Sequence, residues 1–255
     1  MIQLAFGALL AALVALAAAR AHSLSRSGAL AAFAIGTIVF GIGGWPAALV
    51  LFAFFIPSTL LSRVGRSRKR ALLDIEKHGA RDAWQVLANG GVPALGVALV
   101  PLLGAPALAA FAGAFAAASA DTWATEIGTL APGLPRSILG LRPVAHGISG
   151  GITPAGTLAS LGGAAVVALV ASAAGVAPFW PVLVAGFAGS LFDSLLGASV
   201  QALRRCPACN VDCETNPHRC GSPTVLRRGF AWAQNDAVNL GATLCGALIA
   251  AFWVR

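Results

Sequence analysis

Four acidic side chains stand inside segments that are otherwise apolar enough to cross a membrane. They are Asp121, Glu126, Asp193 and Asp236, in a chain of 255 residues that contains only nine Asp and Glu. A carboxylate in the hydrocarbon layer is costly, so it persists only in a polar cavity and usually marks a functional site. The four acids therefore predict an active site within the membrane or at its edge.

These acids suggest magnesium chemistry. Carboxylates near basic loops suit Mg²⁺, which is commonly shared between a few acidic side chains and the phosphates of a substrate. We expect Asp121, Asp193 and Asp236 to bind Mg²⁺. Polar side chains at the same depth are expected to contact phosphate or metal-bound water: Gln85, Asn89, Thr153, Asn235 and Asn239.

Glu126 is harder to assign. It follows Asp121 by five residues, which separates the two by about 140° around a helix. The two acids therefore need not face the same ligand. Two roles stay open for Glu126: a catalytic group, or a buried acid paired with an arginine such as Arg81 or Arg142.

A glycine-rich stretch lies directly before a predicted helix. It reads Gly147-Ile-Ser149-Gly150-Gly151-Ile-Thr153. Backbone N–H groups at such a helix start can hold phosphate oxygens, so Ser149, Gly150 and Gly151, together with Arg142, are candidates for binding a donor phosphate. The stretch lacks the Gly-Lys-Ser/Thr of a Walker A loop, and a simple turn at the membrane surface is equally compatible with it.

The composition is that of a membrane protein. The chain is 58% hydrophobic and 10% charged, with a mean hydropathy of +0.82, whereas a soluble domain is about 25% charged. Closed barrels need alternating polarity, which is lacking. We predict an all-α polytopic bundle of about eight spans, at 2–19, 28–44, 46–62, 83–103, 107–129, 151–173, 179–203 and 231–253.

The basic residues predict the topology. Connections at 20–27, 63–82, 130–150 and 204–230 hold every Lys and Arg except Arg255. Such loops are typically cytoplasmic, so both termini should be outside. The net charge of +8 is explained by this asymmetry, and nucleic acid is not an expected partner. For the cluster Arg63, Arg66, Arg68, Lys69 and Arg70, additional phosphate binding stays open.

The chain also shows an internal repeat. Ser27-Gly28, Gly36-Thr37 and Gly43-Gly44 recur as Ser149-Gly150, Gly156-Thr157 and Gly162-Gly163. We predict a single transmembrane domain over 1–255, built from four-helix halves at about 1–103 and 107–255. An even number of spans per half makes the repeat parallel.

The loop 204–230 is rich in cysteine. Cys206, Cys209, His218 and Cys220 have the spacing of a structural zinc site, and Cys213 could replace one ligand. A redox-active pair, or no special role, are the alternatives.

Several polar motifs together resemble a known family. Gln85-Val-Leu-Ala-Asn89, Asp121-Thr-Trp-Ala-Thr-Glu126, the glycine-rich stretch, Asp193-Ser-Leu-Leu-Gly-Ala198 and Asn235-Asp236-Ala-Val-Asn239 resemble the integral-membrane family that includes the plant phytyl-phosphate kinase of tocopherol synthesis. The resemblance implies transfer of a phosphoryl group from a nucleoside triphosphate to an isoprenoid monophosphate, giving the diphosphate. The cysteine loop is similar to one in prokaryotic members, which implies a prokaryotic plasma membrane.

Asp121-x-x-Ala124 is also similar to a pattern in membrane polyprenol kinases and CTP-dependent cytidylyltransferases, so both CTP and ATP are candidate donors. Our hypothesis is a magnesium-dependent membrane kinase. A CTP-dependent lipid-phosphate cytidylyltransferase and a secondary transporter are the alternatives. The expected partners are the nucleotide, the isoprenoid monophosphate and membrane lipid, and a homodimer is compatible with the sequence.

Overall fold

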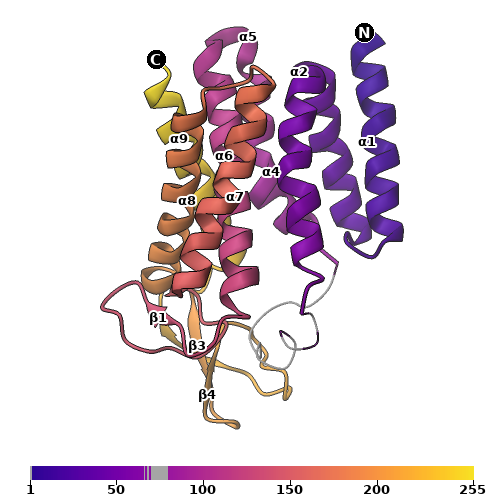
Figure 1. Ribbon diagram of the computed structural model, residues 1–255. Coiled ribbons are helices and arrows are strands. Elements are labelled where there is room, and N and C mark those ends of the chain that lie inside the picture. The colour runs from indigo at the N-terminus through magenta and orange to yellow at the C-terminus, as the bar shows by residue number, and fades with distance from the viewer. Residues whose placement is uncertain (1, 66, 68, 70–79) are drawn as a thin grey trace.

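The protein is a bundle of long helices with a small polar domain at one end, as seen in a computed structural model (Figure 1). The structure describes residues 2–65, 67, 69 and 80–255. Arg66, Arg68 and Arg70 of the predicted basic cluster lie outside the described residues. Within the described part the helices are α1 Ile2–Arg20, α2 Arg26–Leu61, α4 Ala83–Ala98, α5 Val100–Leu103, α6 Ala105–Gly128, α7 Pro154–Ala173, α8 Phe179–Ser199 and α9 Asn235–Trp253.

Helix α2 is two segments that fold back on each other. Gly44 breaks it with φ 62° and ψ −158°, a conformation that glycine adopts without strain. Phe40 and Phe52 lie on opposite sides of this break, and their ring centroids are 5.7 Å apart. In a straight helix twelve residues would separate them by about 18 Å. The segments correspond to the predicted spans 28–44 and 46–62.

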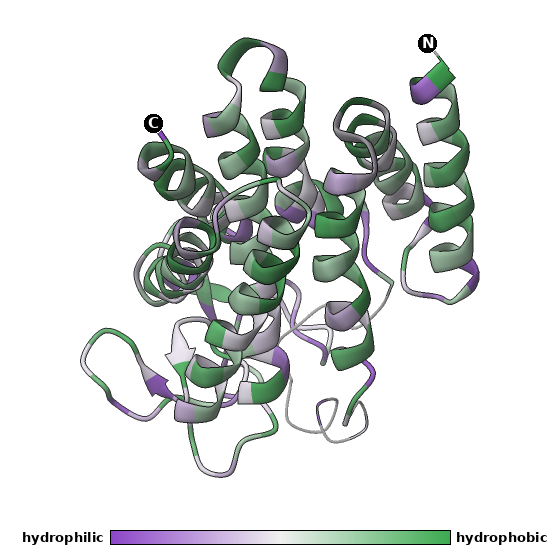
Figure 2. Ribbon diagram, turned by 45° about the horizontal axis from the view of Figure 1, so that its top comes forward, coloured by the Kyte–Doolittle hydropathy of each residue, from purple (hydrophilic) through white to green (hydrophobic). Residues whose placement is uncertain are grey.

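The bundle is apolar enough for a membrane. Five of the described helices, α1, α2, α7, α8 and α9, are long and apolar enough to cross one. Large hydrophobic side chains face outward, for example Leu9, Leu13 and Leu16 of α1, and Figure 2 shows apolar residues along the whole length of the helices. The full count of eight spans and the repeated halves stay predictions.

Helix α6 lies at the centre and packs against α4, α7, α8 and α9. Small residues allow this close approach, as is common between membrane helices. A side chain at Gly113 would place its Cβ 2.5 Å from the carbonyl oxygen of Gly246 on α9. From Phe111 to Ala120 every residue of α6 is buried, and most of these residues are alanine, with Phe111 and Phe115 as the large side chains.

Both chain ends lie at one end of the bundle, and the polar connections lie at the other (Figure 1). Two small antiparallel sheets occur in these connections. One pairs β1 Arg136–Ser137 with β2 Gly151–Ile152. The other has the strand order β4-β3-β5, with β3 Leu203–Cys206, β4 Val211–Cys213 and β5 Val225–Arg228. The all-α prediction was wrong for this second sheet, because a polar loop outside the bundle satisfies its backbone groups by strand pairing.

Some predicted helix limits also differ. The segment 83–103 is divided into α4 and α5, and Pro101 stands in the short second helix. The predicted span 179–203 ends as a helix at Ser199, and its last residue already belongs to β3. The predicted span 231–253 begins only at Asn235.

Candidate functional site

A polar cavity of about 220 Å³ opens where the bundle meets its connections. Five helices and the glycine-rich stretch line it. It brings together most of the site residues predicted from the sequence: Gln85, Asn89, Asp121, Glu126, Ser149, Gly150, Gly151, Thr153, Asp193, Asn235 and Asn239.

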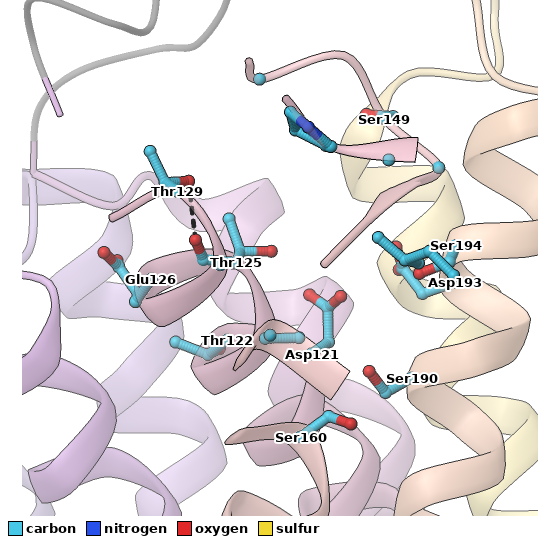
Figure 3. A pocket seen from close by; sticks show the side chains of 18 of the residues that line it. Asp121, Thr122, Thr125, Glu126, Thr129, Ser149, Ser160, Ser190, Asp193 and Ser194 are labelled. Carbon is cyan, nitrogen blue, oxygen red and sulfur yellow. Dashed lines mark hydrogen bonds between the residues drawn. The ribbon is translucent and has the colours of Figure 1, made fainter. Parts of the chain in front are cut away.

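Asp121 of α6 and Asp193 of α8 face this cavity from opposite walls (Figure 3). Small residues on α8 bring these walls together. A Cβ added at Gly189 would lie 2.5 Å from the Cβ of Ala117 on α6. Because Gly189, Asp193 and Gly197 are spaced by four residues, they share one face of α8. The close contact therefore orients Asp193 toward Asp121.

Glu126 points away from Asp121, as the five-residue spacing predicted (Figure 3). Its carboxylate forms an ion pair with Lys69, a buried side chain whose Nζ also donates to the carbonyl of Leu61, at 2.9 Å. Glu126 still lines the cavity, but the pairing favours the structural role for it. The partner is a lysine rather than Arg81 or Arg142.

Arg81 is the arginine that lines the cavity. It is half-buried and lies just before α4. Burial lowers the pKa of Arg81 below its ordinary value, and the charge of Glu126 acts against that shift. Arg142, predicted to hold phosphate, is instead exposed, and its carbonyl accepts from the N–H of Ser137 at 2.9 Å.

The glycine-rich stretch is fixed by a carboxylate from the cysteine loop. Glu214 accepts from the backbone N–H of Ser149 at 2.8 Å and from the Ser149 hydroxyl at 2.9 Å. Gln201 donates through Nε2 to Glu214 and to the Ser149 oxygen, both at 2.8 Å. The Ser149 amide expected to face a phosphate is thus engaged by a protein carboxylate. Glu214 was not recognised in the sequence because its partners are 13 and 65 residues away.

Two predicted binding residues also serve as helix caps. The Thr153 hydroxyl accepts from the N–H of Gly156 at 3.0 Å and so caps α7. Gln85 forms a reciprocal capping box with Asp82 at the start of α4, with both bonds at 3.1 Å. The Gln85 Oε1 atom is therefore engaged, and its Nε2 group is the part that can face a ligand.

Asp236 lies elsewhere. It lines a second polar cavity of about 440 Å³, formed by the cysteine loop and the starts of α4 and α9. Gln85 and Asn235 line both cavities, so the two are neighbours. Asp236 stands in the first turn of α9, where a carboxylate is favoured by the helix dipole. The predicted trio of magnesium ligands is thus divided between two cavities.

Sequence reasoning overlooked several lining residues. His146 precedes the glycine-rich stretch, and its buried Nδ1 atom has no hydrogen-bond partner among the described residues. Ser190 and Ser194 flank Asp193 on α8 (Figure 3). Ser190 is three residues from Asp193, and Ser194 is one residue from it. The three-residue spacing places Ser190 on the same helix face as Asp193, and this spacing was a usable signal in the sequence.

The cysteine loop forms a compact cluster of ligand groups. One ligand atom from each of Cys206, Cys209, His218 and Cys220 lies within 4.8 Å of the others. Cys213 is not part of the cluster, since its buried thiol donates to the carbonyl of Thr215 at 3.8 Å. The structure thus groups the four predicted ligands without Cys213.

The protonation of these thiols suits a cation. A hydrogen bond from His218 is the main cause that lowers the pKa of Cys220 to about 5. Hydrogen bonding with Cys220, followed by desolvation, raises the pKa of Cys209 to about 11. Cys209 therefore keeps its proton, and a divalent ion bound at the cluster would favour the thiolate form of these cysteines.

The arrangement can bind phosphate and a hard cation. Two carboxylates and several hydroxyl and amide oxygens are the donor set that Mg²⁺ prefers. Arg81 and the start of α7 add positive potential at the same cavity. This donor set is suited to binding phosphate groups together with a cation.

Comparison with known proteins places the chain in a family. Residues 9–247 match the family described as integral membrane protein DUF92. The chain is 34% identical over 230 residues to Protein PGR of Arabidopsis thaliana, covering 78% of this chain and 79% of that one. It is 33% identical to the uncharacterized membrane protein MJ0933 of Methanocaldococcus jannaschii, over 98% and 93% of the two chains.

A protein of Synechocystis, uncharacterized membrane protein sll0875, is 27% identical over 67% of this chain and 69% of its own. No solved structure matches the chain. These matches confirm the family resemblance expected from the polar motifs. The chain belongs to the integral membrane protein family DUF92.

Proposed function

We propose that the protein transfers a phosphoryl group from a nucleoside triphosphate to an isoprenoid monophosphate, giving the diphosphate. One observation carries the proposal: Asp121 and Asp193, from separate helices, line one polar cavity together with amide side chains and a glycine-rich stretch. Negative side chains at a phosphate site require a cation between them and the substrate.

Asp121 and Asp193 would hold Mg²⁺, and the serine hydroxyls beside Asp193 complete a donor set of hard oxygens. Bound there, the ion would neutralise phosphate charge and orient the reacting groups. Asn89, Asn235 and Asn239 would donate hydrogen bonds to phosphate oxygens, and Arg81 would offset the charge of the acceptor. The attacking phosphate oxygen is already ionised at neutral pH, so positioning by these side chains suffices without a strong general base.

The nucleotide has a natural place in the second cavity. That cavity, of about 440 Å³, shares Gln85 and Asn235 with the first. A triphosphate reaching across this boundary would put its terminal phosphate beside Asp121 and its base near Arg204 and Gln234. CTP and ATP are both candidate donors for this placement.

We also propose a membrane orientation with both termini outside and the polar connections in the cytoplasm. The end that carries the connections is also the end that carries the described basic residues other than Arg255. The two cavities then open toward cytoplasmic nucleotide. The cysteine cluster would bind zinc and stabilise the loop that carries Glu214.

The test is phosphoryl transfer by the purified protein in detergent with Mg²⁺, ATP or CTP and geranylgeranyl or phytyl monophosphate. The expected product is the lipid diphosphate, identified by mass. A CDP-lipid product would instead indicate a cytidylyltransferase. If the protein binds no nucleotide and makes neither product, the enzyme proposal is rejected and a transporter is favoured.

A further inference from the structure

An apolar groove lies directly beside the polar cavity. It has a volume of about 80 Å³ and is enclosed by α1, α2 and α4, with Phe115 of α6 at its back. Ala15 of α1, Ala32 and Ile35 of the first α2 segment and Phe54 of the second line it.

The groove adjoins the polar cavity. Arg81, Gln85 and Asn89 line both. The start of α4 therefore lies between the apolar groove and the proposed phosphate-binding cavity, and the guanidinium group of Arg81 stands at this boundary. This is the pattern that an amphipathic phosphate ester requires.

The boundary is held rigidly by backbone contacts. The N–H of Ser25 donates to the carbonyl of Arg81, and the N–H of Arg81 donates to that of Ser23, both at 3.0 Å. Gly28 permits this approach, because a Cβ there would lie 2.0 Å from the Arg81 carbonyl oxygen. Leu24, only 5% exposed, closes the groove at this end. The position of Arg81 between the two spaces is thus built into the connection from α1 to α2.

We propose that this groove binds the part of the isoprenoid tail nearest the phosphate of the acceptor, with Arg81, Gln85 and Asn89 holding the phosphate itself. The inference rests on the proposed function and names the acceptor's binding place. The groove accommodates only a few carbon atoms. The remainder of a long tail leaves between α1 and α2 toward lipid, where Leu16 and Leu30 are exposed.

The occupant is a lipid monophosphate rather than bulk phospholipid, because of the charges at the boundary. A monoester phosphate carries its negative charge directly at the end of its tail, so it reaches Arg81 while the tail stays in the groove. A phospholipid has a glycerol unit between its phosphate and its chains, which would have to fit among Leu24, Ile35 and the α4 backbone.

Binding can be measured without turnover. Geranylgeranyl monophosphate with a diazirine near its phosphate is irradiated with the detergent-purified protein, without nucleotide, and labelled peptides are mapped. Label is expected on α1, α2 and α4 at groove residues, and excess unlabelled geranylgeranyl monophosphate should displace it. Label on the outer helix faces only, or label displaced equally by phosphatidylglycerol, overturns the proposal.

Filling the groove provides the second arm. Ala32→Phe places a ring in the groove, whereas the matched control Ala34→Phe adds the same ring on the exposed face of the same helix. Ala32→Phe should raise the KM for geranylgeranyl monophosphate about tenfold or more, raise that for dimethylallyl monophosphate as well, because the groove holds the carbons nearest the phosphate, and reduce labelling. Ala34→Phe should do neither.

No effect of Ala32→Phe on either acceptor, or an equal effect of the control Ala34→Phe, rejects the groove as the tail site. If Ala32→Phe does not fold, the labelling map of the unmodified protein still decides. If that protein phosphorylates no lipid phosphate yet is labelled in the groove, the proposed function fails while the tail site stands.

Discussion

Gly150 offers the sharpest test of how the glycine-rich stretch is positioned. Its φ is +80°, and a Cβ added there would lie 2.4 Å from the backbone nitrogen of Ala198 on α8, with Ala198 Cα and Cβ at 2.6 and 2.5 Å. Gly133 has nearly the same φ, +81°, but nothing within 4 Å of an added Cβ. Gly150→Ala and Gly133→Ala therefore share the backbone strain and differ only in the contact with α8.

The expected magnitudes follow from these contacts. Placing alanine at a left-handed φ costs about 1–2 kcal/mol, which is the whole effect expected for Gly133→Ala. Carbon atoms pack best about 3.5–4.0 Å apart, so Gly150→Ala must also move the stretch away from α8 by roughly 1 Å. Such overpacking costs about 1–3 kcal/mol, which gives Gly150→Ala a total of about 2–5 kcal/mol.

Thermal unfolding in detergent and turnover with geranylgeranyl monophosphate measure the two consequences. A displacement of about 1 Å near the reacting groups lowers turnover about a hundredfold, so Gly150→Ala should lose activity and Gly133→Ala should keep it. Gly197→Ala changes the same contact from the α8 side and is milder, because the added Cβ would lie 2.8 Å from its nearest neighbour, the backbone nitrogen of Gly150. If Gly150→Ala is as stable and active as Gly133→Ala, the stretch is not held by this contact.

Three further predictions concern charges and metals. Asp121→Asn and Asp193→Asn should each lower Mg²⁺-dependent turnover about a hundredfold or more without abolishing lipid binding, and full turnover in both would exclude them as Mg²⁺ ligands. Cys220→Ser should lower bound zinc, measured by atomic absorption, from about one ion per chain toward none. If the unmodified protein contains no zinc after purification, the result counts against the site. Glu214→Gln keeps the shape of the side chain but removes the charge that accepts from Ser149. It should lower the free energy of unfolding by about 1–3 kcal/mol, seen in thermal unfolding, and lower kcat. Unchanged values for both would show that this bond does not position the glycine-rich stretch.

The sequence predicted the polar end of the bundle well, because intramembrane polar residues are few and helix periodicity fixes their depth. Asp121 and Asp193 were placed together for this reason, and the spacing of Glu126 indicated that it need not face the same ligand as Asp121. The break at Gly44 was likewise predicted, because the expected spans 28–44 and 46–62 are separated there, and glycine and proline interrupt helices by backbone geometry alone.

What sequence reasoning missed depends on contacts between distant residues. Lys69 pairs with Glu126 across 57 positions, and no local pattern distinguishes it from the other basic residues of its loop. Asp236 has the same residue type as Asp193 and was assigned to the same predicted magnesium site. Its direction is set by how α9 packs beside the cysteine loop, so its place in the second cavity could not be predicted.

The distribution of packing along α6 bears on the choice between enzyme and carrier. Alternating access needs a path through the bundle that opens to each side in turn. In α6 the polar residues occupy only the half near Asp121, while the half toward α5 is filled by buried alanines and phenylalanines packed against α4 and α9. A close glycine contact, Gly113 against Gly246, locks that half. Opening a polar path there would separate backbones that pack without intervening side chains, so the cavity is better suited to chemistry on a ligand that enters and leaves from one side.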